Sequence, residues 1–384
     1  MNKRRNLFFV FLVTLSFSVP NFLLTPASAQ LAIDEAPLDP PYPKPPSSRS
    51  KRAFHRAEST FQLPLQSDTL GMIKKQSPVK SQESRGSCSI FSATALIESL
   101  VITHRSMSSV DYSEEWLQYV IASISLSDGS TSPRNFSALR QYGTASETFM
   151  PYIGTNWESF SSDILAEKRC KNTTGIYRGA CFVGHRNPAL LSKLDAELSK
   201  PKSPFYDPEF VTARKDAYEF RDAQAAALVP QTYIYSTQVK QLLAQGQPVL
   251  LDLDFYYGAW NHRMADSLGI GRDLTLWAEG AVTYPEYDSL DRTASQRDPA
   301  GHSILLVGYD DTREVTYSYL ARDGKTKVTK TRKGVFYFKN SWGTAKFGVN
   351  FQLDGTSYPG YGFILQDYAN DLGTYHTITV TPAQ

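Results

Sequence analysis

The stretch that begins at Cys88 reads CSIFSATALIESLVITH, and its apolar residues recur with the spacing of a helix. Ile90, Ala93 and Ile97 fall on one face with further apolar residues beside them, which predicts a mostly buried helix. A polar, turn-rich loop at residues 77–87 leads into it. The chain is therefore expected to bury a helix whose first turn carries a cysteine.

A cysteine at the start of a helix has a distinct chemistry. The exposed N–H groups and the positive end of the helix dipole stabilise an anion there. A thiol at this position ionises more readily and becomes a nucleophile. The alternative interpretation is a buried structural cysteine, and the position of Cys88 alone does not decide between the two.

The cysteine count bears on this choice. The chain has three cysteines. Cys170 and Cys181 flank a short, glycine-containing segment, so we expect a local disulfide between them in an exported protein. Cys88 is then the third cysteine, which either forms a disulfide with another molecule or acts as a reactive thiol. No C-x-x-C or H-E-x-x-H pattern occurs, so the sequence supports no metal site.

A nucleophilic cysteine needs a base, and the base needs an orienting group. Among six histidines, His302 stands out because it opens an apolar strand in DPAGHSILLVGYDD. A second strand, in GVFYFKNSWGT, ends at Asn340, whose side chain can accept an imidazole N–H and fix the tautomer. Trp342 follows two places later and can shield that hydrogen bond from water.

Further segments in the second half of the chain predict strands. Pro248–Phe255 is one, and Gly360–Tyr368 contains another. Val315–Leu320 and Lys325–Thr331 flank the turn dipeptide Asp323-Gly324 and predict a β-hairpin. The second half of the chain is therefore expected to be rich in strands.

The N-terminus has the pattern of a secretory signal peptide at residues 1–29, with a basic start, an apolar run and a small-residue ending. The alternative is an uncleaved membrane anchor, but Pro20 interrupts the apolar run and a span needs about 20 apolar residues. Residues 30–68 are proline-rich and then basic, which predicts a linker or a short pro-segment. We expect a secreted protein, extracellular or periplasmic, with no membrane attachment after signal removal.

Charge and composition exclude some classes of partner. The formal net charge is only +2, so the whole-chain field favours neither nucleic acid nor an anionic membrane. The hydrophobic fraction of 41% is that of a globular protein with a sizeable core.

Three ordered motifs resemble those of the papain-like cysteine peptidases. PVKSQESRGSCSIFSA is similar to the family's cysteine motif, GHSILLVGY to its histidine motif and FYFKNSWG to its asparagine motif. YGTASETFMPY resembles the segment that connects them. The resemblance spans roughly residues 75–370, and the style of the signal peptide and the histidine motif favours a bacterial member.

The resemblance implies a role for each matching residue. Cys88 is the nucleophile, and His302 is the base that takes its proton and later protonates the leaving amine. Asn340 orients His302, and Trp342 shields their contact. Gln82 stands at the oxyanion-hole position, where its side-chain amide and the Cys88 N–H hold the developing negative charge. No metal and no organic cofactor are implied.

Two departures from the family pattern concern the cysteine loop. Ser89 stands where the family usually has tryptophan. Arg85 stands where the family commonly has a cysteine, and the segment that would hold its partner, residues 127–143, has none. Both halves of that disulfide are missing together, so we expect the bridge to be replaced. Arg85 itself is interpreted as a solvated loop residue rather than a charge beside the thiolate.

The resemblance also implies the architecture, an α+β fold of two lobes with the active site in the cleft between them. We expect a mainly helical lobe over residues 69–229 and a lobe like an antiparallel β-barrel over 230–384. The first lobe has an insertion at 182–229 with a helical stretch over Pro188–Ser199. The second has an insertion at 255–299, whose aromatic residues either line one end of the cleft or pack as ordinary surface.

We interpret the chain as a secreted cysteine endopeptidase that hydrolyses polypeptides through a thiolate–imidazolium pair and a covalent acyl-enzyme. Two alternatives stay open, an exopeptidase or peptide transferase on the same scaffold, and a catalytically silent binding protein. A serine hydrolase is disfavoured because no G-x-S-x-G motif occurs. We expect a monomer whose cleft accepts either a proteinaceous inhibitor or the chain's own segment at residues 30–68.

Overall fold

The computed structural model describes most of the chain after the N-terminal segment. The predicted signal peptide at residues 1–29 lies outside the described residues, as does nearly all of the segment at 30–68. The described residues are 63–105, 107, 109–122, 126–224 and 227–380.

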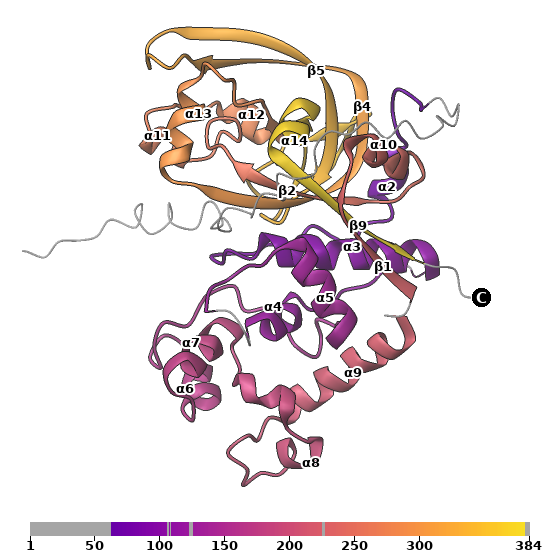
Figure 1. Cartoon of the computed structure of the whole chain (residues 1–384), viewed down its shortest axis with the longest axis vertical. Helices are drawn as coiled ribbons and strands as arrows, with labels where there is room; N and C mark the ends of the chain where they lie inside the picture. The colour runs from indigo at the N-terminus through magenta and orange to yellow at the C-terminus, as the bar shows by residue number, and fades with distance from the viewer. Residues whose placement is uncertain (1–62, 106, 108, 123–125, 225–226, 381–384) are drawn as a thin grey trace, which may run out of the picture. The chain divides into compact units, whose positions relative to one another are not determined.

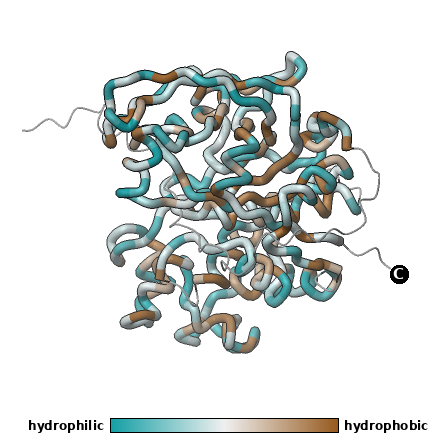
Figure 2. The backbone as a smooth tube through the Cα atoms, turned by 45° about the horizontal axis from the view of Figure 1, so that its top comes forward, coloured by the Kyte–Doolittle hydropathy of each residue, from teal (hydrophilic) through white to brown (hydrophobic). Residues whose placement is uncertain are grey.

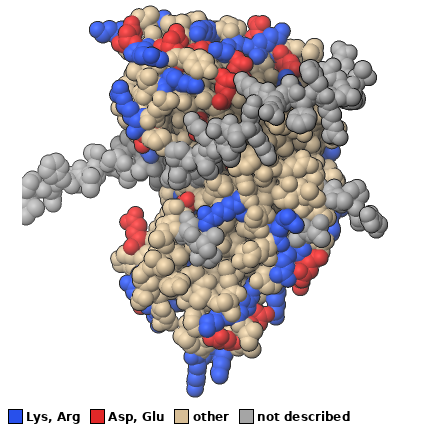
Figure 3. Space-filling model, in the orientation of Figure 1, with Lys and Arg blue, Asp and Glu red and all other residues tan. Residues whose placement is uncertain are grey.

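None of the described helices combines the length and the apolar character that crossing a membrane requires. On the face drawn in Figure 3, many basic and acidic side chains lie close to one another.

Between residues 69 and 224 the regular elements are helices joined by loops, and α3 lies next to the strand-rich part (Figure 1). Every residue of α3 from Cys88 to Val101 is buried, because the helix packs on the sheet and on other helices. The helical segments are α2 (Thr69–Ile73), α3 (Cys88–Arg105), α4 (Glu114–Ala122), α5 (Ser132–Tyr142), α6 (Ile164–Cys170), α7 (Gly175–Gly184), η2 (Pro188–Ser192), α8 (Asp195–Leu198) and α9 (Pro208–Gln224).

The second half of the chain forms a seven-stranded sheet in the order β1-β9-β2-β4-β5-β8-β3. Its neighbouring strands are antiparallel, except that β3 runs parallel to β8. The strands are β1 (Leu228–Ile234), β2 (Val249–Phe255), β3 (Ala281–Val282), β4 (Ala300–Leu320), β5 (Lys327–Lys339), β8 (Tyr361–Leu365) and β9 (Gly373–Val380), and β6 (Gln352–Leu353) pairs with β7 (Thr356–Ser357). Helices α10 (Ser236–Ala244), α11 (Met264–Ser267), α12 (Leu274–Ala278), α13 (Leu290–Ala294), η4 (Ser295–Arg297) and α14 (Gln366–Leu372) lie between them.

The predicted strands and the predicted hairpin are confirmed. β2 begins one residue after Pro248, and β4 and β5 form a long hairpin around Asp323-Gly324. The expected boundary between the lobes at residue 229 falls inside β1, which pairs with β9.

The predicted helical stretch over Pro188–Ser199 is confirmed in part, since most of its residues are helical, but the stretch is not continuous. The structure breaks it into η2 and α8, with extended backbone between them. Arg214 explains the break, because its guanidinium donates to the carbonyl of Leu190 at 2.9 Å and also pairs with the carboxylate of Asp195. These contacts fix the end of one piece and the start of the other.

The helical part and the sheet share one hydrophobic cluster that includes residues of α3, β2, β4 and β5. Brown, hydrophobic stretches run through the interior of the tube in Figure 2. A buried carboxylate adds a polar link. Asp252 on β2 accepts hydrogen bonds from the backbone N–H and the hydroxyl of Ser132, and from the hydroxyl of Ser303. A buried carboxylate is tolerated when several donors satisfy it, so this link fixes α5 against the sheet.

The predicted disulfide is present, since Cys170 and Cys181 are bonded to each other. It joins α6 to α7 and belongs to a small hydrophobic cluster with Trp157 and Ala166. Because both of its cysteines are engaged, neither is available to Cys88.

The interpretation of Arg85 as a solvated residue is wrong. Its side chain is fully buried. Its guanidinium pairs with Asp128 at 2.8 Å and with Glu115 at 3.2 Å, and donates to the carbonyl of Val183 at 2.6 Å. Asp128 lies in the segment where the missing disulfide partner would have been, so an ion pair connects the two segments that a disulfide connects in the family.

This network predicts a large cost for removing the cation. Arg85→Met keeps most of the side-chain volume but leaves Asp128 without its ion-pair partner, and we expect a loss of about 3–5 kcal/mol in the free energy of unfolding, measured by urea denaturation. The control is Arg221→Met, which removes a surface pair with Asp222 and is expected to change the free energy of unfolding far less, because solvent screens an exposed ion pair. Equal losses in the two variants would contradict a structural role for the Arg85 network.

Candidate active site

The cysteine loop is held by the segment that follows β5. The backbone N–H of Gln82 donates to the carbonyl of Ser341 at 2.9 Å, and the N–H of Gly343 donates to the carbonyl of Lys80 at 3.0 Å. These are antiparallel bridge contacts, with Ser81 opposite Trp342. The loop before α3 is therefore fixed to the end of β5, where Asn340 lies.

The side-chain amide of Gln82 has a fixed orientation. Its Oε1 accepts from the hydroxyl of Ser341 at 2.7 Å, and its Nε2 donates to the carbonyl of Arg85 at 2.7 Å. Gln82 is fully buried. Because an amide nitrogen carries two hydrogens, the bond to Arg85 sets the direction of the second hydrogen as well.

His302 and Asn340 are brought together as the sequence predicts. The imidazole Nε2 of His302 lies 2.9 Å from Oδ1 of Asn340. That Oδ1 also accepts from the N–H of Ser341 at 2.9 Å, so it is an acceptor and Nε2 must carry the hydrogen. Nδ1 of His302 is then the basic nitrogen, and it is buried with no hydrogen-bond partner among the described residues.

Aromatic rings enclose this hydrogen bond. The indole of Trp342 stacks on the imidazole of His302, with ring centres 4.6 Å apart and planes 27° from parallel. Trp260 meets the same imidazole edge-on at 5.0 Å. Trp342 is thus placed where the sequence predicts a shield, and Trp260 comes from the insertion at 255–299, for which a lining of the cleft was one of the two interpretations.

The burial of His302 controls its charge. The side chain is fully buried, and burial lowers the pKa of the imidazole to about 3, although the hydrogen bond with Asn340 opposes the shift. The imidazole is therefore neutral near pH 7 in this state. A neutral imidazole with its hydrogen on Nε2 has an Nδ1 lone pair that can take a proton from a thiol.

Cys88 lies on the helix that packs against the strand of His302. It is the first residue of α3 and is fully buried. Ser92, one helical turn further on the same face, donates from its hydroxyl to the carbonyl of Ser303 at 2.7 Å. A hydrogen bond therefore joins Ser303, which follows His302 in the strand, to Ser92, which lies one helical turn after Cys88.

Ser89, where the family usually has tryptophan, connects α3 to the region before and within α5. Its hydroxyl accepts from the N–H of Ser130 at 3.0 Å, and its carbonyl accepts from Nδ2 of Asn135 at 2.8 Å. Together with the ion pair of Arg85 and Asp128, these bonds fix the start of α3 to the same segment. No feature of the sequence pointed to this role.

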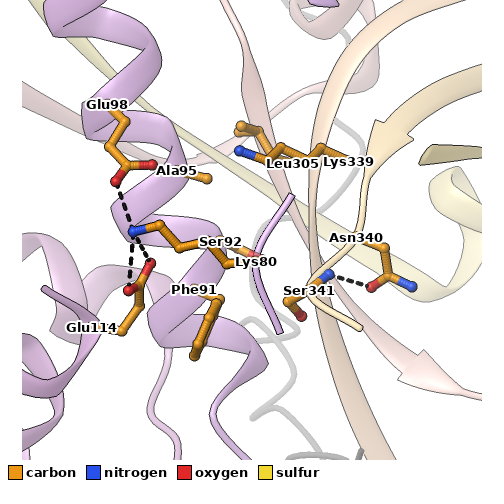
Figure 4. Close-up of a pocket in the computed structure, with 10 residues that line it drawn as sticks. All are labelled: Lys80, Phe91, Ser92, Ala95, Glu98, Glu114, Leu305, Lys339, Asn340 and Ser341. Carbon is orange, nitrogen blue, oxygen red and sulfur yellow. Dashed lines mark hydrogen bonds and ion pairs between the residues drawn. The ribbon is translucent and has the colours of Figure 1, made fainter. Parts of the chain in front are cut away.

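A group of buried charges lines a small pocket next to Asn340, and sequence reasoning missed it (Figure 4). The ammonium of Lys80 lies between the carboxylates of Glu98 and Glu114, 3.0 Å from each. On the other side, Lys339 donates to the carbonyl of Ser77 at 2.8 Å. Burial raises the pKa of Glu114 to about 8 and lowers that of Lys339 to about 8. One feature of the sequence could have indicated this group of charges, namely Glu98 within the apolar run ALIESLV.

Most aromatic residues of the insertion at 255–299 are buried rather than at the surface. His262 is buried among the rings of Phe255, Tyr257 and Trp342, with ring centres 5.5, 5.5 and 6.2 Å away. Trp277 stacks on Trp342 at 5.7 Å. The insertion therefore forms a wall next to the imidazole of His302.

The pKa of His302 predicts a pH effect on stability. In the unfolded chain the imidazole protonates near pH 6.5, but in the folded chain it does so only near pH 3. Between these values the unfolded state holds the extra proton, so the free energy of unfolding falls as the pH falls, by up to about 1.4 kcal/mol per pH unit.

His302→Gln removes this contribution, so its unfolding free energy is expected to depend less on pH between 6.5 and 4.5 than that of the wild type. Urea titrations at several pH values measure the difference. His104→Gln, at an exposed site, is the control and keeps the wild-type slope. A slope unchanged in His302→Gln would show that His302 is not buried as a neutral imidazole.

Comparison with protein-family models gives no match, and comparison with curated proteins gives none either. Solved structures do resemble this chain. Xylellain, a cysteine protease from Xylella fastidiosa, matches with a TM-score of 0.52 and 16% identity over 91% of this chain and 98% of its own.

Two further structures are similar at a lower score. Digestive procathepsin L 3 of the Tenebrio molitor larval midgut has a TM-score of 0.44 and 16% identity, covering 93% of this chain and 80% of its own. The cysteine protease and lectin-like domains of Cwp84 from Clostridium difficile have a TM-score of 0.44 and 13% identity, covering 92% of this chain and 58% of that chain. The match to xylellain, together with the helices and the antiparallel sheet described above, confirms the predicted α+β architecture and shows that the chain has the papain-like cysteine protease fold.

Proposed function

We propose that this chain is a cysteine endopeptidase. The observation that carries the proposal is the hydrogen bond from Nε2 of His302 to Oδ1 of Asn340, which makes Nδ1 the basic nitrogen of a buried imidazole. This imidazole lies on the strand against which the helix of Cys88 packs. A base, its orienting amide and a cysteine at a helix start form the set that nucleophilic catalysis needs.

The reaction proceeds in two stages. Sγ of Cys88 attacks the peptide carbonyl while its proton passes to Nδ1 of His302. His302 then gives that proton to the leaving amine as the C–N bond breaks, which leaves a thioester on Cys88. Water attacks the thioester, again losing its proton through His302, and this step releases the acid product and restores the thiol.

Gln82 is the proposed side-chain donor of the oxyanion hole. Its amide is fixed by Ser341 and Arg85, so one Nε2–H keeps a constant direction during the reaction. The backbone N–H of Cys88 points along the axis of α3 from its N-terminal end, as the first N–H groups of a helix do. Donors fixed before the reaction stabilise the developing charge without reorganisation.

We propose secretion as well. It is implied by the predicted signal peptide at residues 1–29, which lies outside the described residues. A cleft restrained by the segment at 30–68 or by a proteinaceous inhibitor stays a prediction as well, and so does a monomeric state.

Two variants test the proposed chemistry on a denatured protein substrate. Cys88→Ala is expected to abolish cleavage because no thioester can form. Gln82→Glu keeps the acceptor for Ser341 but loses the amide donors, and we expect kcat to fall by about 10²–10³-fold. Gln241→Glu, at an exposed position on α10, is the control and keeps wild-type activity.

Cleavage by Cys88→Ala at the wild-type rate would overturn the proposal. A wild type that binds the substrate without cleaving it would support the silent binding protein instead. Mass spectrometry of the products separates internal cuts from the terminal cuts of an exopeptidase.

A further inference from the structure

The residue that follows His302 is held from two sides. The carbonyl of Ser303 accepts from the hydroxyl of Ser92 on α3 at 2.7 Å, and its own hydroxyl donates to Oδ1 of Asp252 on β2 at 2.8 Å. Ser303 is fully buried, and Asp252 is only 3% exposed. The backbone next to His302 is therefore joined both to the helix of Cys88 and to a buried carboxylate.

Asp252 lies beside this backbone and not beside the imidazole. β2 and β4 are antiparallel, and Asp252 is the residue opposite Ser303. Leu253 is the residue opposite His302. Since neighbouring residues of a strand point to opposite faces of the sheet, the carboxylate and the imidazole lie on opposite faces. Asp252 therefore acts on His302 through the position of the Ser303 backbone rather than by contact.

The same carboxylate binds a helix of the first half of the chain. Asp252 accepts from the hydroxyl of Ser132 at 2.8 Å and from the N–H of this residue at 3.2 Å, and Ser132 is the first residue of α5. Hydrogen bonds to an ionised acceptor are stronger than those between neutral groups. Because α5 packs against α3, these bonds restrain the strand of His302 relative to the helix that begins at Cys88.

One titratable neighbour of Asp252 adds no positive charge. Nε2 of His376 on β9 lies 3.5 Å from Oδ2 of Asp252. Nδ1 of this imidazole accepts from the N–H of Tyr233 at 3.3 Å, so Nε2 carries the hydrogen. Burial lowers the pKa of His376, although Asp252 opposes the shift, and the imidazole is neutral near pH 7. The carboxylate is therefore stabilised by the hydroxyl and N–H donors described above rather than by a cation at His376.

We propose that Asp252 is a positioning residue for the proposed reaction. Through Ser303 it holds the strand of His302 at the distance from α3 at which Cys88 can pass its proton to the imidazole. Proton transfer needs the two groups within hydrogen-bond reach, so a small shift of this strand lowers the population of the thiolate–imidazolium pair. This inference rests on the proposed peptidase function.

Two variants of the full-length protein test the inference on an internally quenched peptide. Ser303→Ala removes the hydroxyl that Asp252 binds and keeps the backbone. We expect kcat to fall about tenfold to a hundredfold, because misplaced reacting groups lose rate on this scale, with KM within about twofold of wild type. Asp252→Asn has nearly the same shape but loses the charge, and we expect a similar loss. Because both changes weaken one hydrogen bond, the double variant is expected to lose little more than the worse single variant.

The pH profile of Cys88 alkylation separates positioning from stability. An isolated thiol has a pKa of about 8.5, so reaction with iodoacetamide at about pH 6 measures a thiolate that the imidazole stabilises. We expect Ser303→Ala to react about tenfold more slowly than the wild type at this pH, and at a similar rate at about pH 9, where a thiol ionises without a partner. A loss of stability alone leaves the profile of the folded protein unchanged.

Ser318→Ala is the matched control, since it removes a hydroxyl from the exposed part of β4, where Ser318 pairs with Thr329. We expect its kcat and its alkylation profile to equal those of the wild type. Wild-type values of both in Ser303→Ala would overturn the inference and leave the peptidase function intact. A loss in Asp252→Asn without one in Ser303→Ala would overturn it as well, because the carboxylate would then act by its charge. A wild type that does not cleave the peptide would overturn the proposed function and this inference with it.

Discussion

The packing of α3 against β4 is the contact on which the candidate site depends. Cys88 begins the helix and His302 lies near the start of the strand, so they come near each other only if the two elements pack. The bond between Ser92 and Ser303 joins positions 211 residues apart in the sequence. Since helix and strand share one hydrophobic cluster, burial of the core is also what orders the site.

The correct predictions concern the parts of the fold that local sequence patterns determine. The helix from Cys88, the strands β2 and β4 and the hairpin at Asp323-Gly324 follow from periodicity and turn chemistry. The disulfide between Cys170 and Cys181 could be predicted because the two cysteines are close in the sequence. Asn340, the partner of His302, could be predicted for another reason, because a strand-end asparagine followed by tryptophan is a compact motif.

The wrong and missing predictions concern residues whose interaction partners lie far away in the sequence. Arg85 has the composition of a loop residue, and nothing near it in the sequence shows that Glu115 and Asp128 surround it. The hydroxyl of Ser89 likewise finds its donor 41 positions away. In both cases polar contacts fix the start of α3, and those of Arg85 stand where the family resemblance implies a covalent bridge. An ion pair needs burial and several further hydrogen bonds to hold a loop in this way, and Arg85 has both.

Burial also constrains how the site can ionise. A lone imidazolium is disfavoured here, because burial lowers the pKa of His302 to about 3. A lone thiolate in a buried position is disfavoured for the same reason, although the helix end offsets part of the cost. In the proposed mechanism, transfer of one proton from Cys88 to His302 creates both charges together and brings no net charge into the core. The thiolate–imidazolium pair that the sequence predicts is therefore stable only as a pair, and its population depends on how closely the two groups approach and on the N–H groups at the start of α3.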